Sequence, residues 1–440
     1  MRRAALTGAV ALAVLAVDAG VALGQPGLRP TDPDAEPGYH GVPEARPVRG
    51  RSVVVHYVRR GPSAPPDVDV DRDRVPDYVE WTADAADQAL AYYRSPRFCP
   101  PILEGRCATF RGFRAPRRDC AGPDRRPDVY LVALGPRTDA TAPWARCRGG
   151  GSFVAISPRL VVGDGNLIHL VTTVGHEMFH LVQYAYAPPL SPWLREATAN
   201  AATAQWTSEL GIEDPEHDYT DPVLERRFGD WLAHVSQSLY SAYSECDPCY
   251  RGFVWWARLM SLDRRALPRL LQRLGAETRG SYPPPARRQL EIFTDVVGGQ
   301  AALTAELTAF SQDLFRMEHA RIERQPPWSP TRRPRRASID GLALHYVPIA
   351  LPPGATSLAF SVTLGPERVT TASLLLPSEP SPQNLTVTAR AVAPSRSVAL
   401  PGGRRRLLFS TTLVHPGEVA GATVLLANGG PEPVRYRLAG

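Results

Sequence analysis

The chain has 440 residues, a formal net charge of +6 at pH 7, and arginine at all 50 of its Lys and Arg positions. This length allows about two or three domains with a sizeable core. The arginines form no stripe with interleaved aromatic residues, so a nucleic-acid partner is not expected. Two Arg-rich stretches, 332–336 and 404–406, lie beside Pro or Gly and are interpreted as a linker and a turn.

Residues 1–24 are typical of a secretory signal peptide. A charged start precedes the apolar run 4–17, and small residues at 22–24 offer a cleavage site. No later stretch is long and apolar enough to span a membrane. We therefore expect a secreted, extracellular protein with no stable membrane insertion. Residues 25–50 are rich in Pro and Gly and are expected to be disordered or a pro-segment.

The cysteines agree with export, because disulfide bonds are the default in an oxidising compartment. The chain contains six of them: Cys99, Cys107, Cys120, Cys147, Cys246 and Cys249. We expect three disulfide bonds: Cys120–Cys147, Cys99–Cys107 and the local pair Cys246–Cys249. This last pair could instead be a redox or zinc pair, but the chain has no second Cys-x-x-Cys motif to complete such a site.

An acidic segment follows a strand candidate at 53–58. Its carboxylates alternate in the spacing of an EF-hand-type calcium loop: Asp69, Asp71, Asp73, Asp77 and Glu80. Alternate oxygen ligands let such a loop wrap a hard cation, and Glu80 can close the shell with both oxygens. Arg74 stands where these loops need Gly for a sharp turn. A helix is predicted at 78–93, and the alternative is an acidic surface turn that caps it.

A motif for metal binding lies in the apolar run 167–186, after strand candidates at 128–134 and 152–156. The run reads as a buried helix that contains His176-Glu177-x-x-His180. Residues four apart share one helix face, so both imidazoles can bind one metal ion. Zinc suits imidazole ligands and, in catalytic sites, leaves one position open for water. Glu177 could take the proton of that water.

A second helix is predicted after a short Pro-rich turn. Ser191 is a good N-cap and Pro192 a good first helical residue, and the following residues favour helix to Trp206. If this helix folds back antiparallel, Glu196 can face the two histidines as a third ligand. The alternative is that Glu196 only complements the helix dipole. Asn200 could hydrogen-bond a ligand imidazole or be a polar surface residue.

These two helices carry a resemblance to a known family. The stretches concerned are Gly175-His176-Glu177-Met178-Phe179-His180-Leu181-Val182-Gln183-Tyr184 and Trp193-Leu194-x-Glu196-Ala197. They resemble the gluzincin metallopeptidases, in particular secreted bacterial metalloproteases distantly similar to hyicolysin. A metzincin is not expected, because Gln183 and Tyr186 stand where that group has Gly and His.

The resemblance covers residues 53–275 and implies roles for single residues. His176, His180 and Glu196 would bind zinc, and Glu177 would be the general base. It also implies a zincin-like, mainly helical domain with a small sheet beside the metal helix, and a protein or peptide as substrate. The family carries a similar Asp-rich segment, which supports a structural role for residues 69–80.

Peptide hydrolysis also needs a donor that stabilises the tetrahedral oxyanion. The candidates are His217, Tyr219, His234, Tyr243 and Tyr250. The resemblance favours Tyr250, because the family often has a Tyr-Gly or similar pair opening a helix, which corresponds here to residues 250–252. Ordinary packing is the alternative for each candidate.

The C-terminal part has a different pattern. Helices are predicted at 251–262, 267–274, 289–297 and 301–322, and residues 325–337 read as a Pro- and Arg-rich linker. Short strands at regular spacing follow, at 342–347, 357–363, 372–376, 386–391, 406–410, 422–426 and 434–438. This spacing predicts a β-sandwich that binds substrate or carbohydrate, or that stabilises the catalytic part.

The predicted fold is therefore α+β, with a zincin-like catalytic domain at 51–324 and a C-terminal all-β sandwich at 338–440. We expect a monomeric, secreted zinc endopeptidase that also holds calcium in its acidic loop. One alternative is a non-catalytic secreted binding protein with a structural or vestigial zinc site. Another is a zinc hydrolase that acts on a non-peptide amide or a glycan-linked substrate.

Overall fold

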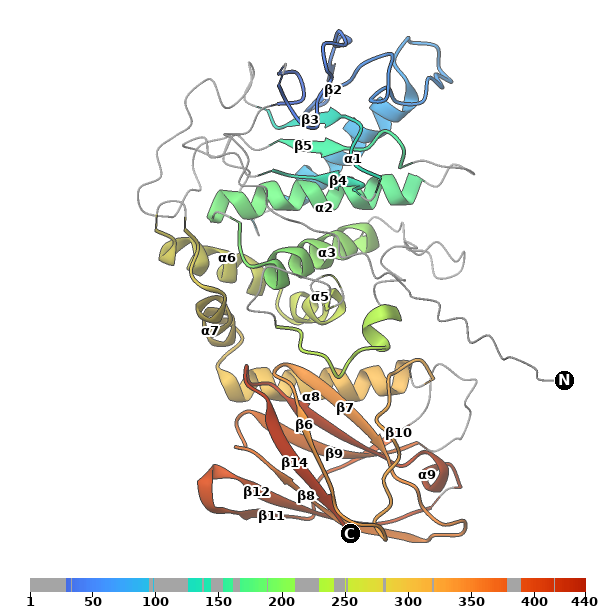
Figure 1. The fold of residues 1–440 in the computed structure, drawn as a ribbon, viewed down its shortest axis with the longest axis vertical. Coiled ribbons are helices and arrows are strands. Elements are labelled where there is room, and N and C mark those ends of the chain that lie inside the picture. Colours follow the sequence, from blue (N-terminus) through green and yellow to red (C-terminus); the bar gives the residue numbers. More distant parts are fainter. Residues whose placement is uncertain are drawn as a thin grey trace, which may run out of the picture.

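The structure is a computed structural model, and it confirms a chain of mixed helices and sheets. It describes residues 29–32, 34–94, 98, 126–136, 138–143, 153–160, 167–187, 189–209, 229–240, 250, 252–279, 282–318, 320–377, 389–414 and 416–440. The expected signal peptide, all six cysteines with their expected disulfides, His217, Tyr219 and Tyr243 lie outside the described residues. Along the long axis of Figure 1 the chain places a mixed sheet first, helices in the middle, and antiparallel sheets last.

The first sheet has the order β1-β2-β3-β5-β4. Its strands are β1 (Val48–Arg49), β2 (Val54–His56), β3 (Asp128–Leu131), β5 (Val154–Ile156) and β4 (Ala140–Thr141). The three central strands are parallel and the two outer strands antiparallel. Alternate side chains point to opposite faces, so Val55, Val129 and Val154 pack with the helices while Tyr130 and Ala155 face the other side.

Two helices cover the inner face of this sheet, α1 (Asp77–Tyr93) and α2 (Leu167–Tyr186). The outer face is covered by residues 29–45, among which Tyr39 is buried against Tyr130. The described part of the segment expected to be disordered or a pro-segment is therefore ordered, and β1 pairs it with β2. The pro-segment alternative stays a prediction.

The helix α2 packs on α3 (Pro192–Glu209) at very short range. Gly175 makes this approach possible, because a Cβ atom there would lie 2.4 Å from the ring of Trp206. The contact lies one residue before His176. The closest contact between the two helices therefore lies next to the His-Glu-x-x-His motif.

The helices that follow form the middle layer of the chain. They are α5 (Phe253–Leu262), α6 (Ala266–Glu277), α7 (Ala286–Val296) and α8 (Gln300–Met317). All four were predicted, with shifted ends. α5 packs on α3, and α8 packs on the C-terminal strands. No helix within the described ranges has the length and hydropathy needed to cross a membrane.

The C-terminal part contains two open antiparallel sheets with the orders β10-β9-β13-β7 and β11-β12-β8-β14-β6. The first sheet holds β7 (Ala343–Pro348), β9 (Thr370–Pro377), β10 (Ala389–Val392) and β13 (Thr423–Asn428). The second holds β6 (Arg335–Ile339), β8 (Ser357–Leu364), β11 (Arg396–Ala399), β12 (Arg405–Thr412) and β14 (Val434–Ala439). A 3-10 turn η4 (Pro401–Gly403) and a short helix α9 (Pro416–Gly421) complete this part.

The four-stranded sheet lies between α8 and the five-stranded sheet (Figure 1). Along β13, Leu425 and Ala427 join the hydrophobic cluster that contains α8. The alternate residues Val424 and Leu426 join a second cluster with residues of β8, β12 and β14. This sheet is therefore apolar on both faces, which explains the continuous apolar run in β13.

The segment interpreted as a linker is packed rather than free. The Gln325 amide donates to the Tyr346 carbonyl, the Trp328 amide donates to the Pro348 carbonyl, and the Trp328 side chain is buried. Residues 335–339 form β6. Residues 229–240 also bond to this edge, because Leu344 donates its amide to the Val235 carbonyl. The two parts of the chain consequently share one hydrophobic cluster.

Candidate metal centre

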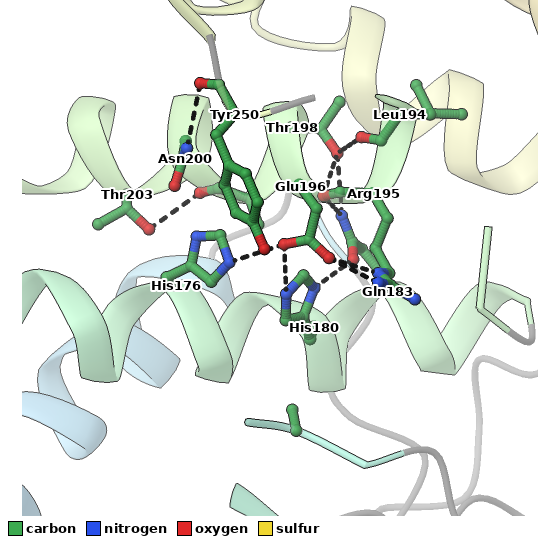
Figure 2. Close-up of polar contacts among 12 residues, drawn as sticks. His176, His180, Gln183, Leu194, Arg195, Glu196, Thr198, Asn200, Thr203 and Tyr250 are labelled. Carbon is green, nitrogen blue, oxygen red and sulfur yellow. Dashed lines mark hydrogen bonds and ion pairs between the residues drawn. The ribbon is translucent and has the colours of Figure 1, made fainter. Parts of the chain in front are cut away.

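The helix α2 carries His176, Glu177 and His180 in a buried setting. The two histidines lie one helical turn apart, and their ring centroids are 4.6 Å apart with the rings nearly perpendicular. Ligand atoms of these three residues lie within 4.8 Å of one another. Figure 2 shows both imidazoles pointing from α2 towards α3.

The helix α3 brings Glu196 to the same point. Its Oε2 atom lies 3.2 Å from His176 Nε2 and 3.4 Å from His180 Nε2. Bonds of about 2.0–2.1 Å in a tetrahedral zinc site place ligand atoms roughly 3.3–3.4 Å apart. Both distances from Glu196 Oε2 therefore match the ligand spacing around one small cation. The structure brings together the three residues that the sequence proposed as ligands.

Glu177 lies in this cluster, and one of its carboxylate oxygens is buried without a hydrogen bond to the part of the chain that the structure describes. Its Oε2 atom is buried and has no hydrogen-bond partner among the described residues. Burial raises the pKa of the Glu177 carboxyl, and the negative charge of Glu196 adds to this effect while the two histidines oppose it. A buried oxygen of this kind needs a polar partner, which a water or a cation would provide.

Arg195 was not predicted as part of the site. Its Nε and Nη2 atoms both lie 2.7 Å from Glu196 Oε1, so the second oxygen of Glu196 remains for the histidines. Burial opposes ionisation of Glu196, but the Arg195 guanidinium and His180 hold the pKa of Glu196 well below its usual value. The carboxylate is therefore charged and oriented before any cation arrives.

Gln183 also lies at this site, although the sequence analysis gave it no role there. Its Nε2 atom donates to the Arg195 carbonyl and to Thr198 Oγ1, which fixes the orientation of the amide. Its Oε1 atom can then only accept, so His180 Nδ1 donates to it over 2.8 Å. This leaves the lone pair of a neutral His180 on Nε2, the atom that faces Glu196.

Tyr250 lies beside His176, next to α3. Its ring centroid lies 6.2 Å from that of His176, and its side chain extends towards His176 and Glu196 (Figure 2). Asn200 donates its side-chain amide to the Tyr250 carbonyl and is buried, so the surface alternative for Asn200 is wrong. His234, another oxyanion candidate, lies in a turn and contacts the Asp230 carbonyl through Nδ1.

The acidic loop forms two overlapping groups of carboxylates. The first contains Asp69, Asp71 and Asp77, and the second contains Asp71, Asp73 and Glu80. Burial and the neighbouring negative charges of Asp73 and Asp71 raise the pKa of Glu80.

The backbone of this loop turns sharply at Arg74. This residue has φ of 76° and takes the left-handed conformation that Gly would adopt there, while its amide donates to Asp69 Oδ2. The departure from Gly therefore does not prevent the turn. The calcium prediction and the acidic surface turn both stay predictions. The turn does not cap the helix, because the N-cap residue of α1 is Pro76 and no described side chain makes a capping hydrogen bond there.

No protein-family model matches this chain, and a search of curated proteins found no match. The resemblance to gluzincins therefore stays a prediction.

Proposed function

We propose that the chain is a zinc-dependent endopeptidase with His176, His180 and Glu196 as the zinc ligands. The observation that carries this proposal is the position of Glu196 Oε2 between the Nε2 atoms of both histidines. Two imidazoles and one carboxylate are a ligand set of catalytic zinc sites. The buried Glu177 Oε2, which needs a polar partner, lies in the same cluster.

In this proposal Glu177 and Tyr250 act on the substrate. Bound zinc would supply a Lewis acid for a water molecule and for the scissile carbonyl. Glu177, whose buried Oε2 lies in the same cluster, takes the proton of the attacking water and passes it to the leaving amine. Tyr250, beside His176, is the proposed donor to the tetrahedral oxyanion.

The same proposal includes the architecture of the two parts of the chain and the location of the protein outside the cell. We propose a zincin-like catalytic part and a C-terminal β-sandwich built from the two open sheets. The charged start and apolar run of residues 1–24 support export, and the six cysteines support disulfide formation outside the cell. We propose that the exported protein is a monomer.

The substitution Glu177→Gln tests the chemistry. It removes the proton acceptor without removing a proposed ligand, so zinc content should stay at one ion per chain while casein cleavage falls by about a hundredfold or more. Zinc content is measured by elemental mass spectrometry and cleavage by peptide release. Normal cleavage by the variant would contradict the mechanism. Zinc binding by the wild type without cleavage of any unfolded protein would favour the non-catalytic binding protein.

We also propose that residues 69–80 bind calcium. Two observations support a cation there: the overlapping carboxylate groups, and the buried Oδ1 of Asp69, which has no hydrogen-bond partner among the described residues. Calcium would relieve the repulsion among these carboxylates, so millimolar calcium should raise the thermal unfolding midpoint of the wild type. The variant Asp71→Asn should lose this increase, because Asp71 belongs to both groups. An equal response of wild type and variant would rule out the loop as the site.

A further inference from the structure

The outer face of the five-stranded sheet gathers arginines from separate parts of the sequence. Arg336 of β6 lies directly opposite Arg437 of β14. Thr363 of β8 pairs with Arg437 on one side and with Arg406 of β12 on the other. Neighbouring strands lie roughly 5 Å apart, so the three arginines form a row about 14 Å long across four strands.

Two further arginines lie on the same face, one on either side of this row. Arg435 lies opposite Ser338, and Arg396 of β11 lies opposite Leu408. We call these five residues the arginine face: Arg336, Arg396, Arg406, Arg435 and Arg437. All five are exposed.

The arginine face has no acidic residue. Its other strand positions are Ser338, Ser357, Ala359, Ser361, Thr363, Val398, Leu408, Ser410, Thr412 and Ala439. No ion pair joins any of the five arginines to another described residue. Some exposed arginines elsewhere are ion-paired, for example Arg273 with Asp295 and Arg287 with Glu291. The charge of this face is therefore uncompensated by its described surroundings.

The position of the sheet leaves this face open. The other face of the sheet packs through Phe360, Phe409 and Tyr436 on the four-stranded sheet, and α8 lies beyond that sheet. The arginine face is consequently turned away from the helices and from the metal centre (Figure 1).

We propose that the arginine face binds an extended anionic polysaccharide that carries carboxylate or sulfate groups. Guanidinium groups bind such oxyanions through two parallel hydrogen bonds, and a row of them fits a linear polymer with recurring charges. The Ser and Thr hydroxyls between the arginines, such as Ser361 and Thr363, can hydrogen-bond to sugar hydroxyls.

Two other classes of anionic partner fit the face less well. Single-stranded nucleic acid is bound by stacking its bases on aromatic side chains, and the face has none. An anionic membrane surface favours exposed apolar anchors. The only large apolar residues on the face, Val398 and Leu408, are half-buried.

The binding should be multivalent and sensitive to salt. An exposed ion pair contributes little to binding by itself, so several arginines must act together along one polymer chain. Salt screens such contacts, and the affinity should therefore fall when sodium chloride is raised from about 50 to 300 mM.

The test compares two triple variants of the full chain. Arg336→Gln, Arg406→Gln and Arg437→Gln remove three charges from the arginine face. Arg264→Gln, Arg273→Gln and Arg287→Gln remove three exposed charges from the helical part and are the matched control. Binding to heparin and to polygalacturonate is measured by calorimetry. We expect the face variant to bind about tenfold more weakly or worse, a change of about 1.4 kcal/mol, and the control to bind like the wild type.

Several outcomes would overturn the proposal. These are no binding of either polysaccharide at low salt, equal losses in the two triple variants, and tighter binding of duplex DNA or of anionic lipid vesicles than of both polysaccharides. If the face triple variant does not fold, the single variants Arg406→Gln and Arg437→Gln, checked by thermal unfolding, must each weaken binding for the proposal to stand. The Glu177→Gln variant should bind the polysaccharides normally, so this test does not depend on peptidase activity.

Discussion

Glu196 divides its two oxygens between different partners, one for Arg195 and one for the two histidines. A buried carboxylate is costly unless it is paired, and here the guanidinium supplies the counter-charge in the absence of a cation. The same contact leaves only Oε2 directed at the imidazoles. The third ligand of the proposed zinc site is therefore oriented by the protein itself.

Gln183 should set the zinc affinity without touching the metal. The substitution Gln183→Leu removes the acceptor for His180 Nδ1, so the ring is free to rotate and to place its proton on Nε2. We expect zinc affinity to fall by about 10- to 100-fold. It is measured by competition with a chromophoric chelator.

The matched control is Gln312→Leu. This glutamine lies on α8 and donates to Ser373 in the β part, so its loss removes a comparable hydrogen bond elsewhere. Zinc affinity of this variant should equal that of the wild type. A Gln183→Leu protein that binds zinc as tightly as the control would show that the amide does not position the imidazole.

At this scale the sequence predicted the residues proposed as ligands, but not the residues that hold them in place. His176 and His180 were predicted because helical spacing alone places them on one face. Gln183 and Arg195 were missed because their partners lie across the contact between two helices, which local spacing does not define. The available signal was the presence of polar residues in helices that read as buried, since each such residue must find a partner.

The contact between α2 and α3 holds the two halves of the ligand set together. It is closest at Gly175, where the Trp206 ring occupies the place of a side chain. In the middle of a helix, Ala is favoured over Gly by about 1 kcal/mol. Packing acts in the opposite direction, since a forced extra carbon in a tight core costs about 1–3 kcal/mol.

The substitution Gly175→Ala shows which effect is larger. We expect packing to dominate because the added Cβ would lie 2.4 Å from a ring atom of Trp206. The variant should unfold at lower urea concentration and bind zinc more weakly. Combining it with Trp206→Leu should give a smaller loss than the sum of the two single losses, because the clash is then removed. A Gly175→Ala protein more stable than the wild type would show that helix propensity dominates.

Helices and strands with a clear hydrophobic period were predicted well. The contacts that depend on the register between paired strands were not predicted. The apolar run of α2 and the alternating strands of the C-terminal part follow from local pattern. The Arg-rich stretches were read as a linker and a turn because Pro and Gly flank them. They supply Arg336 to β6 and Arg406 to β12, and only the pairing of both strands with β14 and β8 brings these residues together.

The helical part of the molecule contacts the C-terminal part at β7, and the two C-terminal sheets pack against each other. His345 of β7 lies between these two sheets, where its Nδ1 contacts the hydroxyl of Tyr436 in β14 at 3.2 Å. Burial lowers the pKa of His345 to about 4, with Arg335 acting in the same direction and Glu323 and Asp340 opposing it. The folded protein therefore keeps this imidazole neutral well below the pH at which an unfolded chain would protonate it.

His345 should make the protein sensitive to mild acid. An ordinary histidine has a pKa of about 6.5, so between about pH 6.5 and 4 the unfolded chain binds a proton that the folded chain does not. The contribution of the neutral imidazole to stability is fully present above pH 6.5 and is lost as the pH falls through this window, by up to about 3 kcal/mol.

The free energy of unfolding in urea, measured at pH 7, 6 and 5 with a chelator present, should fall less steeply for His345→Gln than for the wild type. His234→Gln is the matched control, because this histidine lies in a partly exposed turn, and its profile should follow the wild type. Identical slopes for all three proteins would mean that protonation of the buried imidazole does not limit stability, and that the two sheets are held together in acid by their apolar contacts alone.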